Sequence, residues 1–341
     1  MRVCETNSPA KPKAKRSQEG AFLARSASEE SGPALAGPIS SHALRALAPA
    51  LLLLLAPGLA HAAACCLSTS AFGAGRLAIW EQAAVGANLS YSSAAGLFDG
   101  DGAYRAHDGY SEREGRATAF ALLRLAETLE AGARFPWVVG SRAAGGLEET
   151  GQGPGDLALS LRWQAIDLGA YAELPGVAFT LAATLPSGRA TADSDTVLGA
   201  DVTGRGFGVL SGGISLERAH DPIFVRLDVA GLVPLAHEVA GEPWRSGPGV
   251  EIQLGGGADV GRGVVLVLAP RLRWEAETIR DGVAQPGSSG LEVAVGPSAS
   301  WQFDPHWTLQ ASFDTGLPID GLGRNRSLFT SASIGIRHGI Y

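Results

Sequence analysis

The sequence predicts an all-β fold, an antiparallel transmembrane β-barrel of about twelve strands that occupies residues 83–341. Three observations predict this fold class. The candidate strands alternate apolar and polar residues, the connections between them alternate short and long, and tryptophans lie at strand ends. In an outer-membrane barrel, short periplasmic turns alternate with long extracellular loops in the same way.

The short connections contain the residue types of tight turns. Residues 219–222, 261–263 and 304–306 each separate two apolar runs and contain Gly, Pro or Asp. Residues 126–128 have less turn chemistry, and residues 166–176 occupy the place of a fifth turn although they are longer. The long connections, which are rich in Gly, Asp, Glu and Ser, are residues 93–115, 138–155, 185–205, 234–248, 276–289 and 315–326.

The candidate strands have a period of two. In residues 156–164 the odd positions are all Leu or Trp, whereas Arg162 and Gln164 lie on the opposite face. Residues 223–233, 250–260 and 291–303 repeat this alternation. In a barrel the apolar face meets lipid and the polar face lines the lumen, although a strand of a soluble sandwich can alternate in the same way.

Parity opposite the apolar face predicts the residues that line the lumen. They are Arg124, Arg162, Arg226, Asp228, Glu251, Arg271, Arg273, Glu292 and Gln302. These residues are candidates for a role in permeation. Small barrels are filled by side chains, so the same residues could instead form a cross-strand ion-pair network that only fills the interior.

Five tryptophans mark strand ends. If the mature N-terminus is periplasmic, Trp163, Trp301 and Trp307 fall at periplasmic ends, and Trp137 and Trp274 fall at extracellular ends. Such positions form the two aromatic belts of a membrane protein, where an amphipathic ring is stable at headgroup depth. The alternative is that each ring belongs to a hydrophobic core.

Residues 1–64 are predicted to be a leader outside the fold. Residues 46–60 form an apolar run that follows Arg45 and precedes small residues, which is the pattern of a secretory signal peptide. The preceding segment is too long for the basic start of a signal peptide, so we expect translation to begin near Leu44. Residues 65–82 are then expected to be a periplasmic N-terminal segment before the barrel.

The adjacent Cys65 and Cys66 leave three interpretations open. Cys65 could carry a lipid, the pair could form a disulfide in the oxidising periplasm, or both could be inert thiols. Ala62 stands where a lipidation motif usually has Leu, which argues against the lipid. Two cysteines alone would make an incomplete metal site.

Other function classes lack their characteristic residues. The net charge is −7 and all three lysines lie in residues 11–15, so no basic surface for nucleic acid is visible. The histidines lack the spacing of a zinc site or a nucleophile elbow, and the nearest nucleophile and base are Ser331 or Ser333 with His338. We therefore expect no enzyme, no cofactor and no metal.

Two short motifs carry a family resemblance. Gly-Asp-Leu at residues 155–157 enters a strand after a long connection, and Leu-Pro-Ser-Gly at residues 185–188 ends a strand. With the Gly-rich continuation to an aromatic C-terminus, the chain over roughly residues 85–341 resembles the outer-membrane family named for the meta pathway of phenol degradation. The resemblance implies a barrel that passes small, often hydrophobic or aromatic, compounds, and it carries no catalytic residues.

The predicted function is a channel or transporter for such solutes in the outer membrane of a Gram-negative bacterium. The alternative is a structural or adhesive barrel whose loops bind and which has no permeation role. The expected partners are outer-membrane lipid, small solutes and the barrel-assembly machinery, with no nucleic acid and with the oligomeric state open. Acidic residues in the long connections, among them Asp99, Glu112, Glu114 and Asp195, predict a weak preference for cations.

Overall fold

A computed structural model describes residues 75–341 except 107–108, 172 and 240–241. The predicted leader with its predicted signal peptide, and Cys65 and Cys66, lie outside the described residues. In the described chain, no helix is both long enough and apolar enough to span a membrane.

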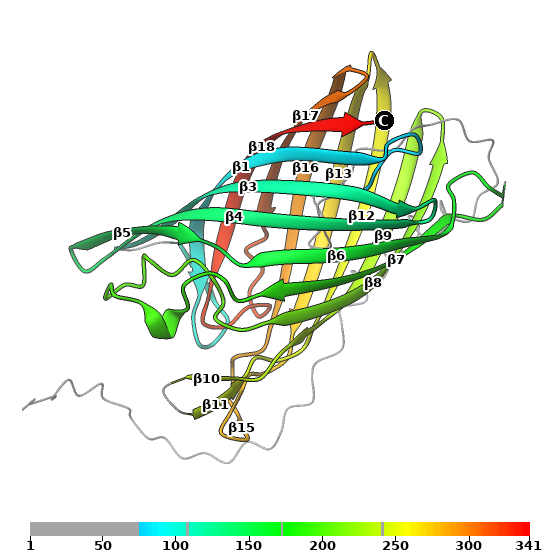
Figure 1. The fold of residues 1–341 in the computed structure, drawn as a ribbon. Coiled ribbons are helices and arrows are strands. Elements are labelled where there is room, and N and C mark those ends of the chain that lie inside the picture. The colour runs from blue at the N-terminus through cyan, green and yellow to red at the C-terminus, as the bar shows by residue number, and fades with distance from the viewer. Residues whose placement is uncertain (1–74, 107–108, 172, 240–241) are drawn as a thin grey trace, which may run out of the picture. The chain divides into compact units, whose positions relative to one another are not determined.

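The fold is a closed antiparallel barrel of 12 strands (Figure 1). Consecutive barrel strands pair with each other, and pairing from Ala83 with Ile340 to Phe98 with Arg326 closes the ring between its first and last strands. The twelve strands in pairing order are β1 (Ala83–Phe98), β3 (Tyr110–Ala126), β4 (Leu129–Ala144), β6 (Leu157–Ile166), β7 (Gly176–Leu185), β8 (Val209–His220), β9 (Ile223–Pro234), β12 (Gly249–Gly261), β13 (Val264–Glu275), β16 (Gly290–Asp304), β17 (Trp307–Gly316) and β18 (Arg326–Ile340).

The alternation of short and long connections is confirmed. The five predicted turns join β3 to β4, β6 to β7, β8 to β9, β12 to β13 and β16 to β17. All five lie at one end of the barrel, which we call the short-turn end, because successive strands are antiparallel. The six long connections lie at the opposite end, the long-connection end.

The long connections are more ordered than predicted. The strands run well into them, so that β1 and β3 stay paired as far as Ser93 with Arg113. They also contain β2 (Tyr104–Ala106), β5 (Leu147–Pro154), a short 3-10 helix (Thr191–Asp193), and a second sheet made of β10 (His237–Val239), β11 (Glu242–Arg245), β14 (Ile279–Arg280) and β15 (Val283–Ala284). The polarity that suggested loops shows only that these segments meet water, because polar strands still pair through their backbones.

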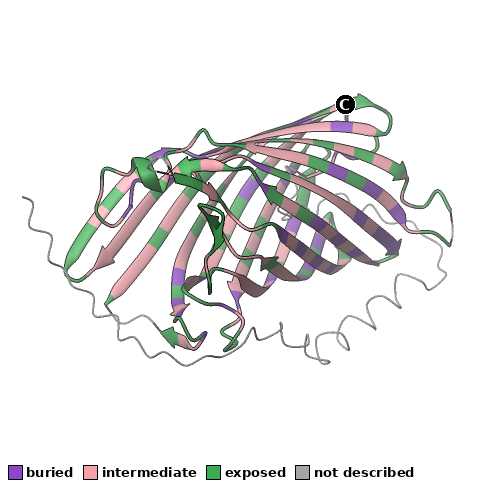
Figure 2. Ribbon diagram, turned by 90° about the horizontal axis from the view of Figure 1, so that it is seen from below, coloured by how far each residue is buried: buried purple, intermediate pink, exposed green. Residues whose placement is uncertain are grey.

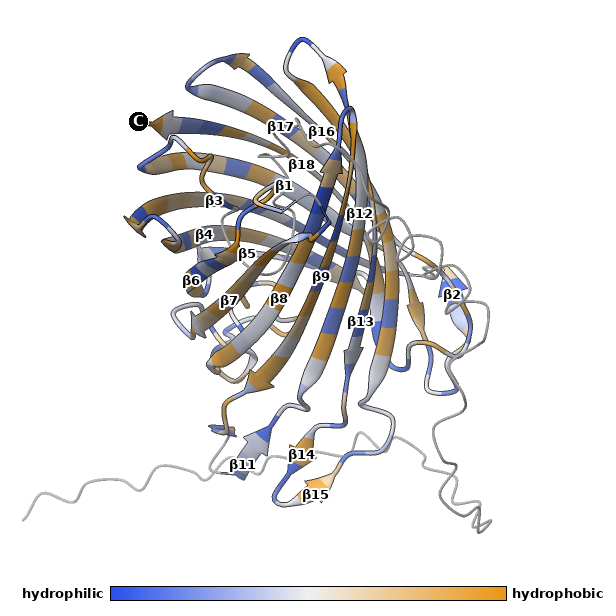
Figure 3. Ribbon diagram, turned by 90° about the vertical axis from the view of Figure 1, so that its right-hand side faces the viewer, coloured by the Kyte–Doolittle hydropathy of each residue, from blue (hydrophilic) through white to orange (hydrophobic). Residues whose placement is uncertain are grey.

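The barrel has an apolar outside and a polar inside. Large apolar side chains are exposed along the outer face, as at Leu181 (66% exposed) and Leu89 (61%), whereas Asp228 (4%) and Glu251 (2%) are buried inside. Along each strand the hydropathy therefore alternates (Figure 3), and the buried residues form short bands across the strands (Figure 2). Water would make such an outer surface unstable, whereas a bilayer stabilises it.

This arrangement predicts opposite responses on the two faces of β7. In lipid vesicles, Leu181→Arg should lower the free energy of unfolding by about 2 to 4 kcal/mol, because it places a guanidinium in hydrocarbon at mid-strand. Ala182→Arg is the matched control, since it places the same group on the polar inner face. Urea unfolding monitored by tryptophan fluorescence measures both, and an equal loss of stability in the two variants would contradict the assigned faces.

Candidate functional site: the interior of the barrel

An N-terminal strap, residues 75–82, crosses the barrel interior at the short-turn end. The Arg76 guanidinium forms an ion pair of 2.8 Å with Glu217 on β8, and Arg337 on β18 donates a hydrogen bond of 3.5 Å to the Arg76 carbonyl oxygen. The strands β8 and β18 lie halfway around the ring from each other in the pairing order. The strap therefore spans the interior from wall to wall.

Further hydrogen bonds anchor the strap to the walls. Glu81 accepts hydrogen bonds from Arg337, and Arg124 donates to the carbonyl oxygens of Ala78 (2.6 Å) and Glu81 (2.8 Å). Glu130 on β4 accepts from the Leu77 amide at 3.3 Å. The expected periplasmic segment thus lies inside the barrel over residues 75–82, because its charged and amide groups find buried partners there.

A second group of charges lies on β8 and β9. Arg226 and Asp228 form an ion pair of 2.9 Å, and the Ser215 hydroxyl donates a hydrogen bond to the Asp228 carboxylate. All three side chains are buried, as is that of Glu251 on β12. Removing one partner of such a pair leaves a buried charge without compensation, so this group stabilises the interior only as a unit.

The remaining predicted lumen residues divide between the interior and its two ends. Arg162 lies 3.8 Å from Glu130 near the strap, and Arg271 pairs with both Glu292 (3.5 Å) and Asp314 (3.2 Å). Towards the long-connection end, Arg273 pairs with Glu275 at 2.5 Å. Gln302 is exposed at a short turn, where it donates to the Pro305 carbonyl oxygen at 3.0 Å. It therefore caps a turn at the short-turn end.

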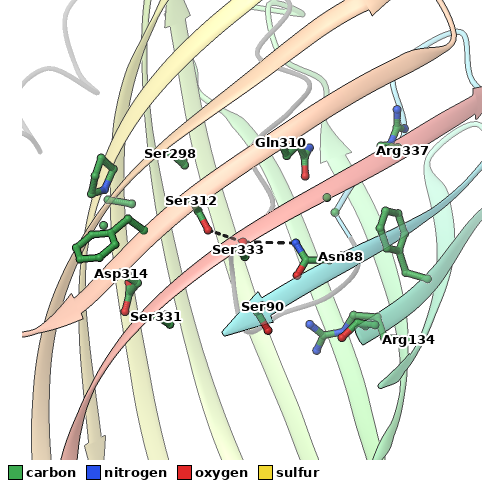
Figure 4. Close-up of a pocket in the computed structure, with 18 of the residues that line it drawn as sticks. Asn88, Ser90, Arg134, Ser298, Gln310, Ser312, Asp314, Ser331, Ser333 and Arg337 are labelled. Atoms are coloured by element: carbon green, nitrogen blue, oxygen red, sulfur yellow. Dashed lines mark hydrogen bonds between the residues drawn. The ribbon is translucent and has the colours of Figure 1, made fainter. Parts of the chain in front are cut away.

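A cavity of 310 Å³ lies within the interior, next to the strap (Figure 4). Its lining includes many uncharged polar residues. Asn88 donates a hydrogen bond to Ser333 at 3.4 Å, and the Ser312 hydroxyl lies 2.7 Å from that of Ser333. Four arginines also line it, namely Arg76, Arg134, Arg271 and Arg337. The cavity is thus a polar chamber large enough for a small organic molecule.

Several residues of this interior were not predicted from the sequence. Glu81, Glu130, Glu217 and Arg337 hold the strap, and Arg134 lines the cavity. Parity could have found Arg134, since the neighbouring Phe135 and Trp137 face outward. The strap has no periodic pattern, so no local signal indicates where it binds.

The five predicted belt tryptophans are all exposed on the outer face. Trp163, which stacks on Phe179 with ring centroids 5.6 Å apart, lies near the short-turn end with Trp301 and Trp307. Trp137 and Trp274 lie towards the long-connection end. Their location at headgroup depth stays a prediction.

The serines and the histidine considered as a nucleophile and base lie on opposite faces of β18. Ser331 and Ser333 line the cavity, whereas His338 contacts the outward-facing Trp307 with ring centroids 4.5 Å apart. That pair therefore cannot work together. Among the described residues, no group of His, Cys, Asp or Glu could hold a metal ion.

The connection between β7 and β8 folds over the β4–β5 hairpin at the long-connection end. Its centre is Asp201, whose carboxylate accepts hydrogen bonds from the Ser194 and Thr196 hydroxyls, the Asp195 amide and Arg189. Hydrogen bonding, above all from Ser194, holds the pKa of Asp201 well below its usual range. The ionised carboxylate therefore organises the whole connection.

The depressed pKa of Asp201 gives a pH prediction. A lowered folded-state pKa contributes stability above the unfolded-state value of about 4, and this stability is lost only as the pH falls through the folded-state pKa. Amide hydrogen exchange in residues 189–203, corrected for intrinsic rates, should stay protected at pH 4. Asp201→Asn should raise exchange there at neutral pH, and Asp193→Asn, an exposed acid of the same connection, should not. Similar exchange in both variants would contradict the prediction.

The fold and its polar interior define a closed barrel of the outer-membrane type. The chain is similar in structure to the COG4313 outer membrane channel from Pseudomonas putida F1, with a TM-score of 0.64 and 15% identity over 80% of this chain and 100% of that chain. It is less similar to the β domain of the Bordetella autotransporter BrkA (TM-score 0.45, 13% identity, 76% of this chain, 100% of that chain) and to the NanC porin (TM-score 0.43, 9% identity, 74% of this chain, 98% of that chain).

No protein-family model matches the sequence. A comparison with curated proteins also finds no significant match. The structural similarity therefore supports the barrel that the resemblance to the phenol-degradation family implies, and membership of that family stays a hypothesis.

Proposed function

We propose that the protein is a channel of the Gram-negative outer membrane for small solutes, with hydrophobic or aromatic compounds as the preferred class. The observation that carries this proposal is the closed barrel with an apolar exterior and a polar interior that contains a cavity of 310 Å³. The similar fold of a known outer-membrane channel supports it. In this proposal the short-turn end faces the periplasm, and a signal peptide in the leader directs export.

The strap limits how wide the pathway is. It crosses the interior beside the cavity, and its Leu77 packs with Ala84 and Leu122 in a small buried cluster. A narrow pathway suits single small molecules and excludes large ones. The second candidate is a barrel without a permeation role. A strap that always stays in the interior would favour it.

Conductance in planar bilayers separates the two candidates. The full chain should give small single-channel steps, and Glu81→Gln should enlarge them, because it weakens the ion pair that holds the strap to Arg337. Glu127→Gln, which changes an exposed carboxylate of a short turn, is the control and should leave the steps unchanged. A barrel that conducts neither as wild type nor as Glu81→Gln is a structural or adhesive protein.

The predicted cation preference should be weaker than the acidic connections alone suggest. Asp99, Glu112, Glu114 and Asp195 each form an ion pair with an arginine at 2.6 to 2.8 Å, which offsets much of their charge. The reversal potential across a salt gradient at low ionic strength should therefore lie close to zero on the cation side. It should move nearer to zero at about 1 M salt, where the Debye length is about 3 Å. Clear anion selectivity at low salt would contradict this expectation.

A further inference from the structure

The arginines that line the cavity are not all paired with a carboxylate. Of its four arginines, Arg76 pairs with Glu217, Arg337 with Glu81, and Arg271 with Glu292 and Asp314. Within the described part of the chain, the Arg134 side chain has no hydrogen bond or ion pair. Two acids pair with Arg271, and the Arg134 guanidinium faces the cavity with no carboxylate of the described residues in contact with it.

Arg134 is well placed to receive an anion. It lies on the inner face of β4 beside Ser90 of β1, both facing the cavity (Figure 4). A guanidinium presents two parallel N–H groups to a carboxylate, and this bidentate geometry is stronger than a hydrogen bond between neutral groups. A half-buried guanidinium without a protein partner has already lost part of its hydration on folding. A bound carboxylate therefore gives it favourable interactions at little further desolvation cost.

An apolar ring adjoins this charge. Phe120 on β3 is the cross-strand partner of Arg134 and also lines the cavity. Its ring lies over Gly86, where an added Cβ would stand 2.4 Å from the Phe120 Cζ atom, and it packs against the cluster of Leu77, Ala84 and Leu122. Because residue 86 is a glycine, the Phe120 ring can lie against the barrel wall. Packing against the Leu77, Ala84 and Leu122 cluster fixes one side of the ring.

The two side chains together match one chemical class. A ligand with a planar ring and a carboxylate at one end can stack on Phe120 while its oxygens pair with Arg134. The cavity of 310 Å³ is at the lower end of the usual range for ligand sites, which fits a single ring and not a sugar chain. The hydroxyls of Ser90 and Thr118 on the same wall can donate to the same carboxylate.

We propose that Arg134 and Phe120 form a binding site for small aromatic carboxylates inside the barrel. As a step on a permeation path, the site rests on the proposed channel function and gives it a substrate class. Its charge selects the carboxylate, and its ring selects the aromatic group. Neutral aromatic compounds then bind more weakly because they leave Arg134 uncompensated.

Titration calorimetry of the full chain in detergent tests the site, with benzoate as the probe. Benzoate should bind more tightly than benzyl alcohol, which lacks the charge, and more tightly than acetate, which lacks the ring. Arg134→Gln should weaken benzoate binding by about tenfold or more and leave benzyl alcohol binding unchanged. Arg142→Gln is the matched control, because Arg142 is an arginine of the same strand, β4, that pairs with Glu112 at 2.8 Å outside the cavity lining.

Two further variants guard against misfolding, which heat-modifiable migration on a gel monitors. Phe120→Leu should weaken benzoate binding and leave acetate binding unchanged. Arg134→Lys keeps the charge without the paired N–H groups and should fall between the wild type and Arg134→Gln. The proposal is overturned if benzoate does not bind, if acetate binds as tightly, or if the Arg134 variants bind benzoate like the wild type.

The outcomes distinguish this proposal from the channel function. Binding in detergent requires no conduction. A barrel that binds benzoate through Arg134 but does not conduct keeps the site and loses the channel. A barrel that conducts and does not bind benzoate loses only the site.

Discussion

Closure of the hydrogen-bonded ring is the constraint on which the rest of this structure depends. Lipid offers no partner to a backbone N–H or C=O group, so a sheet can lie in a bilayer only if its first and last strands pair. Here β1 and β18 pair over almost their whole length. Once the ring is closed, the alternation along each strand decides which side chains point outward and which point inward. A residue that faces lipid has neighbours on both sides that face the interior.

The inside of a barrel of this size must then be filled or compensated. Twelve strands enclose more space than an eight-stranded barrel, whose side chains fill it, and less than a porin, whose lumen is an open channel. In this protein the chain itself fills one end, through the strap, and ion pairs fill much of the rest. Arginine is the cation throughout, because its planar group can pair with a carboxylate and a carbonyl oxygen at the same time, as Arg337 does with Glu81 and Arg76.

How far the sequence predicts this structure depends on the range of the interactions. Turns such as residues 261–263 and 304–306 are local, and their Gly, Pro and Asp residues determine them. Facing is also local, because it follows from parity, so Arg226 and Asp228 could be placed inside. The strap could not be predicted, since Arg76 meets Glu217 across 141 residues and nothing in its own segment indicates that partner. The strands within the long connections were not predicted for a related reason. Polar strands such as β5 have no alternating hydropathy, and β5 forms because β4 extends beyond the barrel and pairs with it.

The residue without a partner is as informative as those with one. Natural interiors rarely keep an uncompensated charge, because its desolvation costs several kcal/mol unless water or a ligand restores the lost interactions. The other arginines of the cavity each have a carboxylate, so the chain clearly has acids to place where it needs them. Pro136, Gly132 and Ala133 surround Arg134 on β4, and none can accept a hydrogen bond from it through a side chain. No side chain of β4 next to Arg134 therefore neutralises its charge, and the Phe120 ring lies beside it against Gly86. An unpaired guanidinium in an interior whose other cavity arginines are all paired marks a place where the partner comes from outside the chain.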